Sequence, residues 1–208
     1  MLSYDPNTPA RPLGRPVSID PEAVAALALK MFAERGYEQT SMEDIARHAG
    51  VGRKTLYRHF ANKAELVWGG MGPVIEASAP LLDAPHTPGS PAQEILAGIQ
   101  SALIAGVAAL PNLAVTRGRL RLIAEHAELM NRSHEFLGAQ RKQTCDYLTA
   151  RGVSDESARY FCAALIGVTF EAWLQWAASD DPDPVSHLRR ALGYVIVAEW
   201  GPSGETSG

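Results

Sequence analysis

The chain has 208 residues, of which 46% are hydrophobic and 20% charged, and its 19 Lys and Arg against 23 Asp and Glu give a formal net charge of −4. This is the composition of an ordinary globular protein, long enough for one good-sized domain or two small ones. The two cysteines, Cys145 and Cys162, exclude a disulfide framework, and no Cys/His spacing resembles a zinc site.

Two further features bear on where the protein is found. The first sixteen residues lack the apolar core of a secretory signal, and the most apolar run, residues 102–110, is too short to span a bilayer. We therefore expect a reducing cytoplasm and no membrane association. The cysteines are most simply buried small hydrophobic residues, with a redox role as the alternative.

Charge is distributed unevenly along the chain. Residues 1–65 hold nine Lys and Arg against eight Asp and Glu, whereas residues 66–208 hold ten against 15. A localised cationic face on an acidic chain indicates a polyanion-binding site, although a charge run alone can be a solvated surface. Residues 45–63 contain no acid and five cations: Arg47, Arg53, Lys54, Arg58 and Lys63.

The N-terminal residues predict an arm followed by a first helix. Residues 1–17 hold four prolines and are expected to form a flexible arm. Asp20 is a good N-cap, Pro21 suits the first helical position and Gly36 suits the end. The apolar positions recur three and four apart, as expected of one buried helix face: Val24, Leu27, Ala28, Met31 and Phe32.

A second short helix is expected to start at Thr40 or Ser41. Thr40 and Glu43 fit a capping box, in which each side chain satisfies a free backbone N–H of the other residue. Gly50 is expected to stop this helix after about two turns.

A third helix follows after only Val51 and Gly52. Gly52 is an acceptable N-cap, and Leu56 with Phe60 forms one apolar stripe. Two short helices joined by a tight glycine turn, the second with one buried stripe, make a helix-turn-helix. The major groove of DNA admits such a helix, whose first turns approach base edges and phosphates.

Six side chains in this region have the chemistry that DNA binding needs. Basic groups bind guanine edges or phosphates, hydroxyl and imidazole groups bind phosphate oxygens, and a cation at the start of the next helix adds to a phosphate site. Tyr57 has a core role as the alternative, but Leu56 and Phe60 already occupy the inward stripe. The six are Arg53, Lys54, Thr55, Tyr57, His59 and Lys63.

Residues 20–66, and TSMEDIARHAGVGRKTLYRHFANKAEL above all, resemble the DNA-binding domain of TetR-family transcriptional regulators. The resemblance implies an all-helical protein of two domains that dimerises through its C-terminal helices. It implies binding to a palindromic operator, repression, and release by a small molecule held in the C-terminal domain.

The resemblance also implies roles for single residues. Arg53, Lys54 and Tyr57 would face bases. The DNA backbone would be held by Thr40 or Ser41, Thr55, Tyr57, His59 and Lys63. Gly52 departs from the family pattern, which usually has Ser or Thr there, so one hydroxyl contact is lost.

The whole chain is predicted to be all-α, with about nine helices. The expected division is an arm (1–17), a helix-turn-helix domain (18–66), a ligand-binding and dimerisation domain (67–200) and a tail (201–208). The fourth helix, from residue 62 towards 78, contains GGMGP at 69–73, which should weaken or kink it. This stretch is either a hinge or a plain helix break.

The larger domain suits a mainly apolar effector, although each candidate side chain can equally be core. The candidates are Trp68, Met130, Phe136, Tyr147, Phe161, Phe170 and Trp173. In TRGRLRLIAEHAEL, Arg117, Arg121 and Glu125 lie four apart and predict a surface ladder.

The last two expected helices span residues 155–179 and 184–200. The first is apolar nearly all round, so one face is expected to meet a partner subunit, and the second offers another apolar stripe. Together they predict a four-helix contact in a homodimer. The alternative is that both helices are simply buried core.

We therefore expect a DNA-binding regulator, a ligand-released repressor acting as a homodimer, without cofactor or metal. The alternative is an architectural DNA-binding protein without an effector. An enzyme fits poorly: HEFLG at 134–138 has Gly138 where a zinc protease needs histidine, and GVGRKT departs from a phosphate loop and follows no strand.

Overall fold

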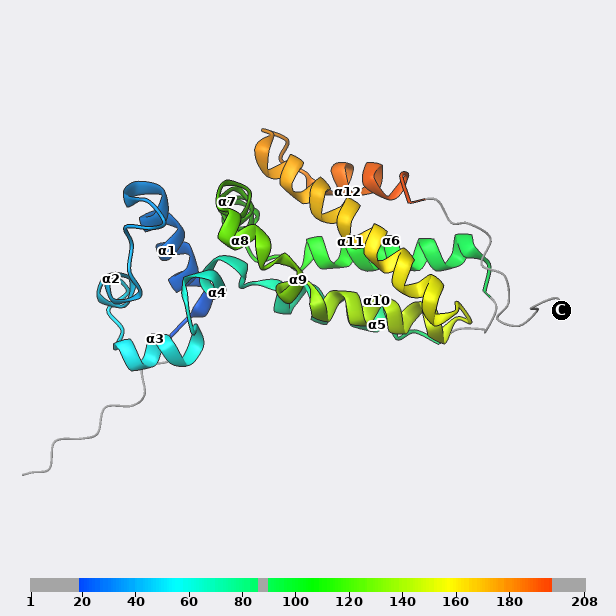
Figure 1. The fold of residues 1–208 in the computed structure, drawn as a ribbon, viewed down its shortest axis with the longest axis horizontal. Coiled ribbons are helices and arrows are strands. Elements are labelled where there is room, and N and C mark those ends of the chain that lie inside the picture. The colour runs from blue at the N-terminus through cyan, green and yellow to red at the C-terminus, as the bar shows by residue number, and fades with distance from the viewer. Residues whose placement is uncertain (1–18, 86–89, 196–208) are drawn as a thin grey trace, which may run out of the picture. The chain divides into compact units, whose positions relative to one another are not determined.

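The computed structural model of the protein describes residues 19–85 and 90–195, which contain 12 α-helices and no strand (Figure 1). The all-helical prediction is confirmed. There are more helices than the expected nine or so because residues 62–78 and residues 127–151 each form more than one helix. The expected arm (1–17) and tail (201–208) lie outside the described residues, as does the end of the last expected helix, 196–200.

Two compact units divide the chain, residues 1–61 and residues 62–208, here called the N-terminal and C-terminal units. In the N-terminal unit, α1 (Pro21–Arg35) begins where the Asp20 carboxylate accepts hydrogen bonds from the N–H groups of Glu22 and Ala23. It ends at Gly36, whose φ of +92° lies in the left-handed region that favours glycine. Both predicted ends of this helix are confirmed.

The start of α2 (Met42–His48) corrects the expected capping box. Ser41 is the N-cap: its hydroxyl accepts from the Asp44 N–H, and the Asp44 carboxylate accepts from the Ser41 N–H. Thr40 is instead buried, at 1% exposure, and its hydroxyl donates to the Gly36 carbonyl at 2.9 Å. The hydrogen bonds from Ser41, with the Arg47 guanidinium, lower the pKa of Asp44 to about 2.

The turn after α2 has the predicted form. Gly50 has a φ of +66°, and the Val51 N–H donates back to the Ala46 carbonyl at 3.0 Å. The following helix, α3 (Arg53–His59), packs against α2 through Leu56, which is fully buried, with Phe60 buried just past its end. The helix-turn-helix is confirmed.

In the C-terminal unit, the predicted weakness of the fourth helix is a complete break. Helix α4 (Lys63–Trp68) starts at Asn62, whose side chain accepts from the Glu65 N–H, and stops before Gly69. Gly70 has a φ of +90° and precedes α5 (Met71–Leu82). Its role as a hinge stays a prediction.

The remaining helices complete the C-terminal unit (Figure 1). Helix α5 packs on α6 and α10, while α11 contacts α7, α10 and α12. A Cβ at Gly106 of α6 would lie 2.8 Å from Val74 Cγ1 of α5, so glycine permits the close approach of these two helices. The bounds are α6 (Ala92–Ala108), α7 (Leu113–Glu125), α8 (Ala127–Asn131), α9 (Ser133–Phe136), α10 (Gly138–Ala150), α11 (Asp155–Ala178) and α12 (Pro184–Leu192).

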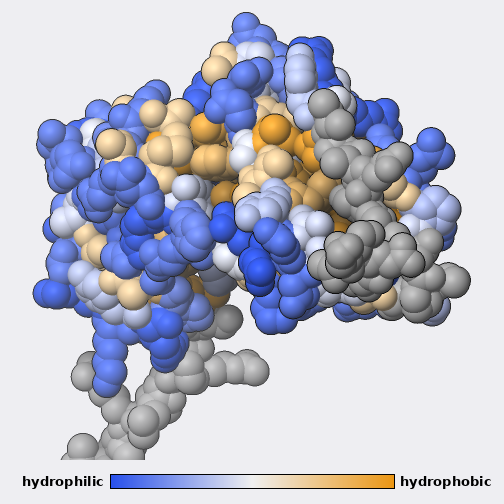
Figure 2. Space-filling model, turned by 45° about the vertical axis from the view of Figure 1, so that its right-hand side comes forward, coloured by the Kyte–Doolittle hydropathy of each residue, from blue (hydrophilic) through white to orange (hydrophobic). Residues whose placement is uncertain are grey.

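Apolar side chains from α5, α6, α10 and α11, with Val153 and Val195 from outside the helices, form the main core of the C-terminal unit. In Figure 2 apolar residues also reach the surface between polar ones. Cys162 is buried within the core, and the Cys145 thiol, half-buried, donates to its Sγ at 2.8 Å. Burial, with that hydrogen bond, raises the pKa of the Cys162 thiol. The core comprises Leu82, Ile95, Ile99, Ala102, Tyr147, Leu148, Val153, Ala158, Phe161, Cys162, Leu165 and Val195.

By length and composition alone, α11 is the one helix among the described residues that could cross a membrane, and α6 with α7 would pass as a pair bent by 106°. Nearly half of the apolar stretch of α11 is buried inside the unit against its neighbouring helices. This pattern is that of a core helix.

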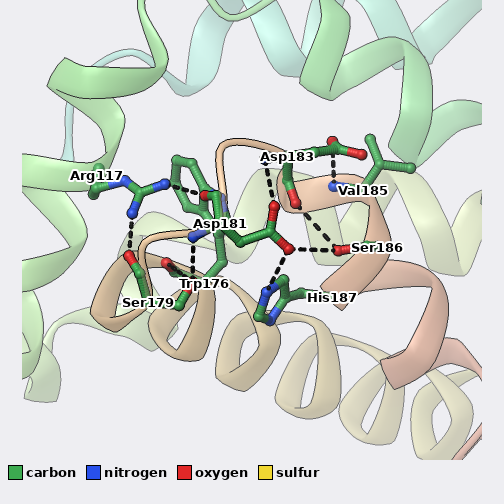
Figure 3. Close-up of polar contacts among 8 residues, drawn as sticks. All are labelled: Arg117, Trp176, Ser179, Asp181, Asp183, Val185, Ser186 and His187. Atoms are coloured by element: carbon green, nitrogen blue, oxygen red, sulfur yellow. Dashed lines mark hydrogen bonds and ion pairs between the residues drawn. The ribbon is translucent and has the colours of Figure 1, made fainter.

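The loop from α11 to α12 is organised by Asp181 (Figure 3). Its carboxylate accepts from the Asp183 N–H at 2.9 Å and from the Ser186 hydroxyl at 3.1 Å, and lies 3.3 Å from His187 Nε2. The backbone hydrogen bond from Asp183, with these side-chain partners, lowers the pKa of Asp181. On the other side, the Arg117 guanidinium donates to the Ser179 and Asp181 carbonyls.

We predict that Asp181→Asn destabilises the protein in a pH-dependent way. Because the pKa of Asp181 is lowered in the folded state, its stabilisation is present at neutral pH and is lost as the pH falls through that pKa. Thermal unfolding should show Tm lower by roughly 2 °C at neutral pH and no difference well below the ordinary value of 3.8. Asp180→Asn, an exposed neighbour, is the control, and an equal Tm shift for both variants would contradict the assignment.

Candidate functional site

The exposed face of α3 carries the basic and aromatic groups singled out from the sequence. Leu56 and Phe60 are buried at 0% and 7% exposure, whereas Tyr57 is 41% exposed. Since the two buried positions lie four apart, the rest of the helix faces away from the core. The exposed residues of α3 are Arg53, Lys54, Tyr57, Arg58 and His59.

The other residues predicted to contact DNA differ in their exposure and in the unit to which they belong. Ser41 is exposed at the start of α2 and Thr55 is half-buried on α3, but the buried Thr40 hydroxyl already donates to a carbonyl. Of the pair Thr40 or Ser41, only Ser41 presents its hydroxyl at the surface. Lys63 is the first residue of α4, half-buried, and belongs to the C-terminal unit.

Glu43 of α2 is a member of this surface that the sequence analysis missed. Its Oε1 lies 2.6 Å from Arg53 Nη2 and accepts from the Tyr57 hydroxyl at 3.4 Å. One carboxylate thus joins α2 to two residues of α3 that were expected to face bases. The ion pair is 67% exposed on the Arg53 side and 41% on the Glu43 side, so it contributes at most about 1 kcal/mol. The sequence offered no sign of it, because Glu43 also suited the capping box.

Gly52, at the N-cap of α3, provides no side-chain cap. Its φ of −67° and ψ of 142° are open to any residue. A Cβ there would have Thr55 Oγ1 as its nearest neighbour, 3.8 Å away, so the backbone and the space around it both accept a larger side chain.

Comparison with known proteins identifies the helix-turn-helix. The family model described as "Bacterial regulatory proteins, tetR family" matches residues 25–67, which include α2, the glycine turn and α3. Over these residues the helix-turn-helix matches that of the TetR family, as the resemblance implied. The match supports the role in transcriptional regulation that the resemblance implied.

The relatives of this chain are named as transcriptional regulators. MftR of Mycobacterium tuberculosis, named as a mycofactocin biosynthesis transcriptional regulator, is 26% identical over 187 residues, covering 88% of this chain and 92% of MftR. YezE of Bacillus subtilis, an HTH-type transcriptional regulator, is 32% identical over 79 residues, covering 38% of this chain and 41% of YezE. The crystal structure of PfmR from Thermus thermophilus has 20% identity, covers 83% of this chain and 96% of its own, and gives a TM-score of 0.49.

A pocket lies inside the C-terminal unit of the regulator. The centre of a water molecule can occupy about 90 Å³ of it, whereas a site for one water needs roughly 10–15 Å³. Most of its wall is apolar. The lining residues are Val67, Trp68, Gly69, Gly70, Val74, Leu103, Val107, Leu110, Thr116, Arg119, Leu120, Ile123, Leu137, Gln140, Ile166, Thr169, Phe170 and Trp173.

Three of the seven predicted ligand residues line this pocket: Trp68, Phe170 and Trp173. Phe136 does not line it and stacks on the Trp68 ring at 5.2 Å, and Met130 is half-buried on α8. Tyr147 and Phe161 belong to the main core, where the Tyr147 hydroxyl donates to the Ile95 carbonyl. Those two side chains fill space between helices rather than a cavity.

The arginines of α7 correct the expected surface ladder. Arg117 donates to carbonyls after α11, and Arg121 Nε donates to the Ala177 carbonyl at 2.7 Å, so both guanidinium groups serve the C-terminal end of α11. Arg119, between them, is buried at 6% exposure and lines the pocket. Nothing in the sequence distinguishes Arg119 from Arg117 and Arg121, because the three arginines alternate in similar surroundings.

We predict that Glu43→Gln increases the affinity of the regulator for DNA of any sequence several-fold at low salt. The substitution removes an acid from the surface of α2 and α3 that is expected to face DNA, and it releases Arg53 from its ion pair. Fluorescence anisotropy with a random-sequence duplex measures the effect. Glu38→Gln makes the same charge change at an exposed position of the same unit, and an equal gain there would contradict a specific role for Glu43.

Proposed function

We propose that this chain is a ligand-released repressor that binds a palindromic operator as a homodimer. The observation that carries the proposal is the exposed cationic face of α3 in a helix-turn-helix of the TetR family. Residues 18–66 would form the DNA-binding domain and residues 67–200 the ligand-binding and dimerisation domain. A cytoplasmic location accords with this role.

In the proposed complex, α3 lies in the major groove. Arg53 and Lys54, at its first turn, reach base edges together with Tyr57. Phosphates are held by the remaining hydroxyl, imidazole and ammonium groups. These are Ser41, Thr55, His59 and Lys63.

A homodimer is supported by what α11 and α12 leave exposed. Tyr160 and Tyr194 are 70% and 75% exposed, which is unusual for residues of their size and apolar character. On α11 the next three exposed residues after Tyr160 are small and recur at helical spacing: Ala163, Ala164 and Gly167. The larger exposed side chains, Glu171 and Gln175, come further along the helix. Because helices with small surface residues can approach closely, this stripe suits an isologous contact with the same helices of a second chain.

Release by a ligand is supported by the pocket in the C-terminal unit. Its wall includes Trp68, the last residue of α4, and Gly69 and Gly70, which separate α4 from α5. Helix α4 begins four residues after α3 ends. A ligand that moves this wall therefore acts on the helix that directly follows the helix-turn-helix.

The test is recovery of sheared DNA from the source genome by the purified protein, with Tyr57→Ala beside the wild type. Enrichment of a few palindromic sites, lost in the variant, is expected, with half-sites about 34–36 Å apart or a multiple of that distance. Tyr57 is 41% exposed, so its removal leaves the core stripe of α3 intact. Recovery of all sequences equally would instead indicate an architectural DNA-binding protein.

We predict that Gly52→Ser tightens DNA binding and leaves stability nearly unchanged. The backbone at Gly52 already has a conformation that Ser adopts, and the space around it is open. Because Ser and Gly differ by only a few tenths of a kcal/mol as N-caps, chemical unfolding should shift little. Anisotropy with the recovered operator should show a gain of about tenfold at most, from one hydroxyl–phosphate hydrogen bond. Gly52→Ala is the control, and an equal gain with Ala would contradict the hydroxyl contact.

A further inference from the structure

Among the described residues that line the pocket, Arg119 is the one that carries a charge. Its side chain comes from α7 and is 6% exposed. Three other polar side chains share the wall: Thr116 and Thr169 donate to carbonyls of their own helical segments, while Gln140 projects its amide from α10. The other lining residues that the structure describes are apolar or glycine, and none of them is acidic.

The guanidinium lies against the break between α4 and α5. A Cβ built at Gly70 would be 2.3 Å from Arg119 Nη1, and one built at Gly69 would be 3.9 Å from Nη2. Gly70 thus leaves the space that the guanidinium occupies, whereas a side chain at Gly69 would only come into ordinary contact with it. Gly70 also has a φ of +90°, so this position favours glycine for two separate reasons.

A guanidinium in the wall of an apolar pocket has a consequence for ligand choice. It carries five N–H donors, and those that face the pocket can give charge-assisted hydrogen bonds to an anion that enters it. Arg presents a planar fork of donors that matches a carboxylate, sulfonate or phosphate. A neutral apolar ligand in the same pocket would gain nothing from this charge.

We propose that the pocket binds an amphipathic ligand that carries one anionic group, held by Arg119, on an apolar body. The body lies among the aromatic rings of Trp68, Phe170 and Trp173, and the Gln140 side chain in the same wall offers a further polar group. This inference rests on the proposed role of the pocket as the effector site. It adds the charge of the effector and the residue that selects it.

The contact between the anion and Arg119 also links the ligand to the turn between α4 and α5. An anion that binds the guanidinium draws it away from Gly69 and Gly70, so the turn between α4 and α5 changes its surroundings. Trp68, the last residue of α4, contacts the same ligand from the other side of the turn. Binding and the position of α4 are thereby coupled through two adjacent contacts.

Two fluorescent dyes with one ring system test the proposal. Anilinonaphthalene sulfonate carries an anionic group, whereas N-phenylnaphthylamine has the same rings and no charge. Titrations of the wild type, Arg119→Met and Arg119→Lys give the affinity of each dye. We expect Arg119→Met to weaken binding of the sulfonate at least about tenfold and binding of the neutral dye by less than about twofold. Arg119→Lys should fall between, because it keeps the charge but not the planar fork.

Arg121→Met is the matched control, because it removes the same charge from the same helix at an exposed position outside the pocket. Equal loss of the sulfonate in Arg119→Met and Arg121→Met would overturn the proposal, as would equal loss of both dyes in Arg119→Met. If the Arg119 variants do not fold, a crystal structure of the wild type with the sulfonate decides. Sulfonate oxygens on the guanidinium are expected, and a sulfonate directed to solvent would overturn the assignment.

The dye titrations need no DNA, so they fail or succeed separately from the proposed function. Arg119-dependent dye binding that leaves operator binding unchanged would support the pocket chemistry and contradict ligand release. Operator binding and release by another compound, without a preference for the anionic dye, would contradict the anionic ligand alone.

Discussion

The indole of Trp68 holds the end of α4 in place. Its Nε1 donates to the Leu129 carbonyl at 3.1 Å, and its ring stacks on Phe136 at 5.2 Å and on Phe170 at 5.8 Å. One side chain therefore ties α4 to α8, α9 and α11. Because a packed aromatic cluster has few alternative arrangements, a shift of Trp68 moves α4 as a unit rather than by gradual deformation. The same ring faces the pocket, so the occupant of the pocket and the anchor of α4 are in direct contact.

Features decided by the local backbone could be predicted from the sequence. Asp20, Gly36 and Gly50 mark helix ends through hydrogen bonds and left-handed dihedral angles that depend on neighbours within four residues. The choice between Thr40 and Ser41 could not be made in this way. Both side chains can cap a helix, and only the packing that buries Thr40 against the end of α1 separates them.

Features decided by packing between distant segments were not predictable. Arg117, Arg119 and Arg121 alternate along α7 in similar sequence surroundings, yet only Arg119 is buried. The difference comes from α11, whose C-terminal carbonyls accept from Arg117 and Arg121. The candidate ligand residues fell into two groups for the same reason: Phe161 fills the core, whereas Trp173 lines the pocket. The sequence around an aromatic residue does not show which of these two positions it takes.

The exposed carboxylate of Glu43 changes how ions are exchanged when DNA binds. A basic side chain that docks on a phosphate normally releases a condensed cation from the DNA, and such releases set how steeply affinity falls with salt. Arg53 arrives with an anion already attached to the protein, 2.6 Å away. Contact with a phosphate must either displace that anion, which stays tethered beside the duplex, or share the guanidinium with it. In either case Glu43 acts as a counterion that belongs to the protein. The affinity for DNA should therefore fall less steeply with salt than the number of exposed arginines and lysines suggests.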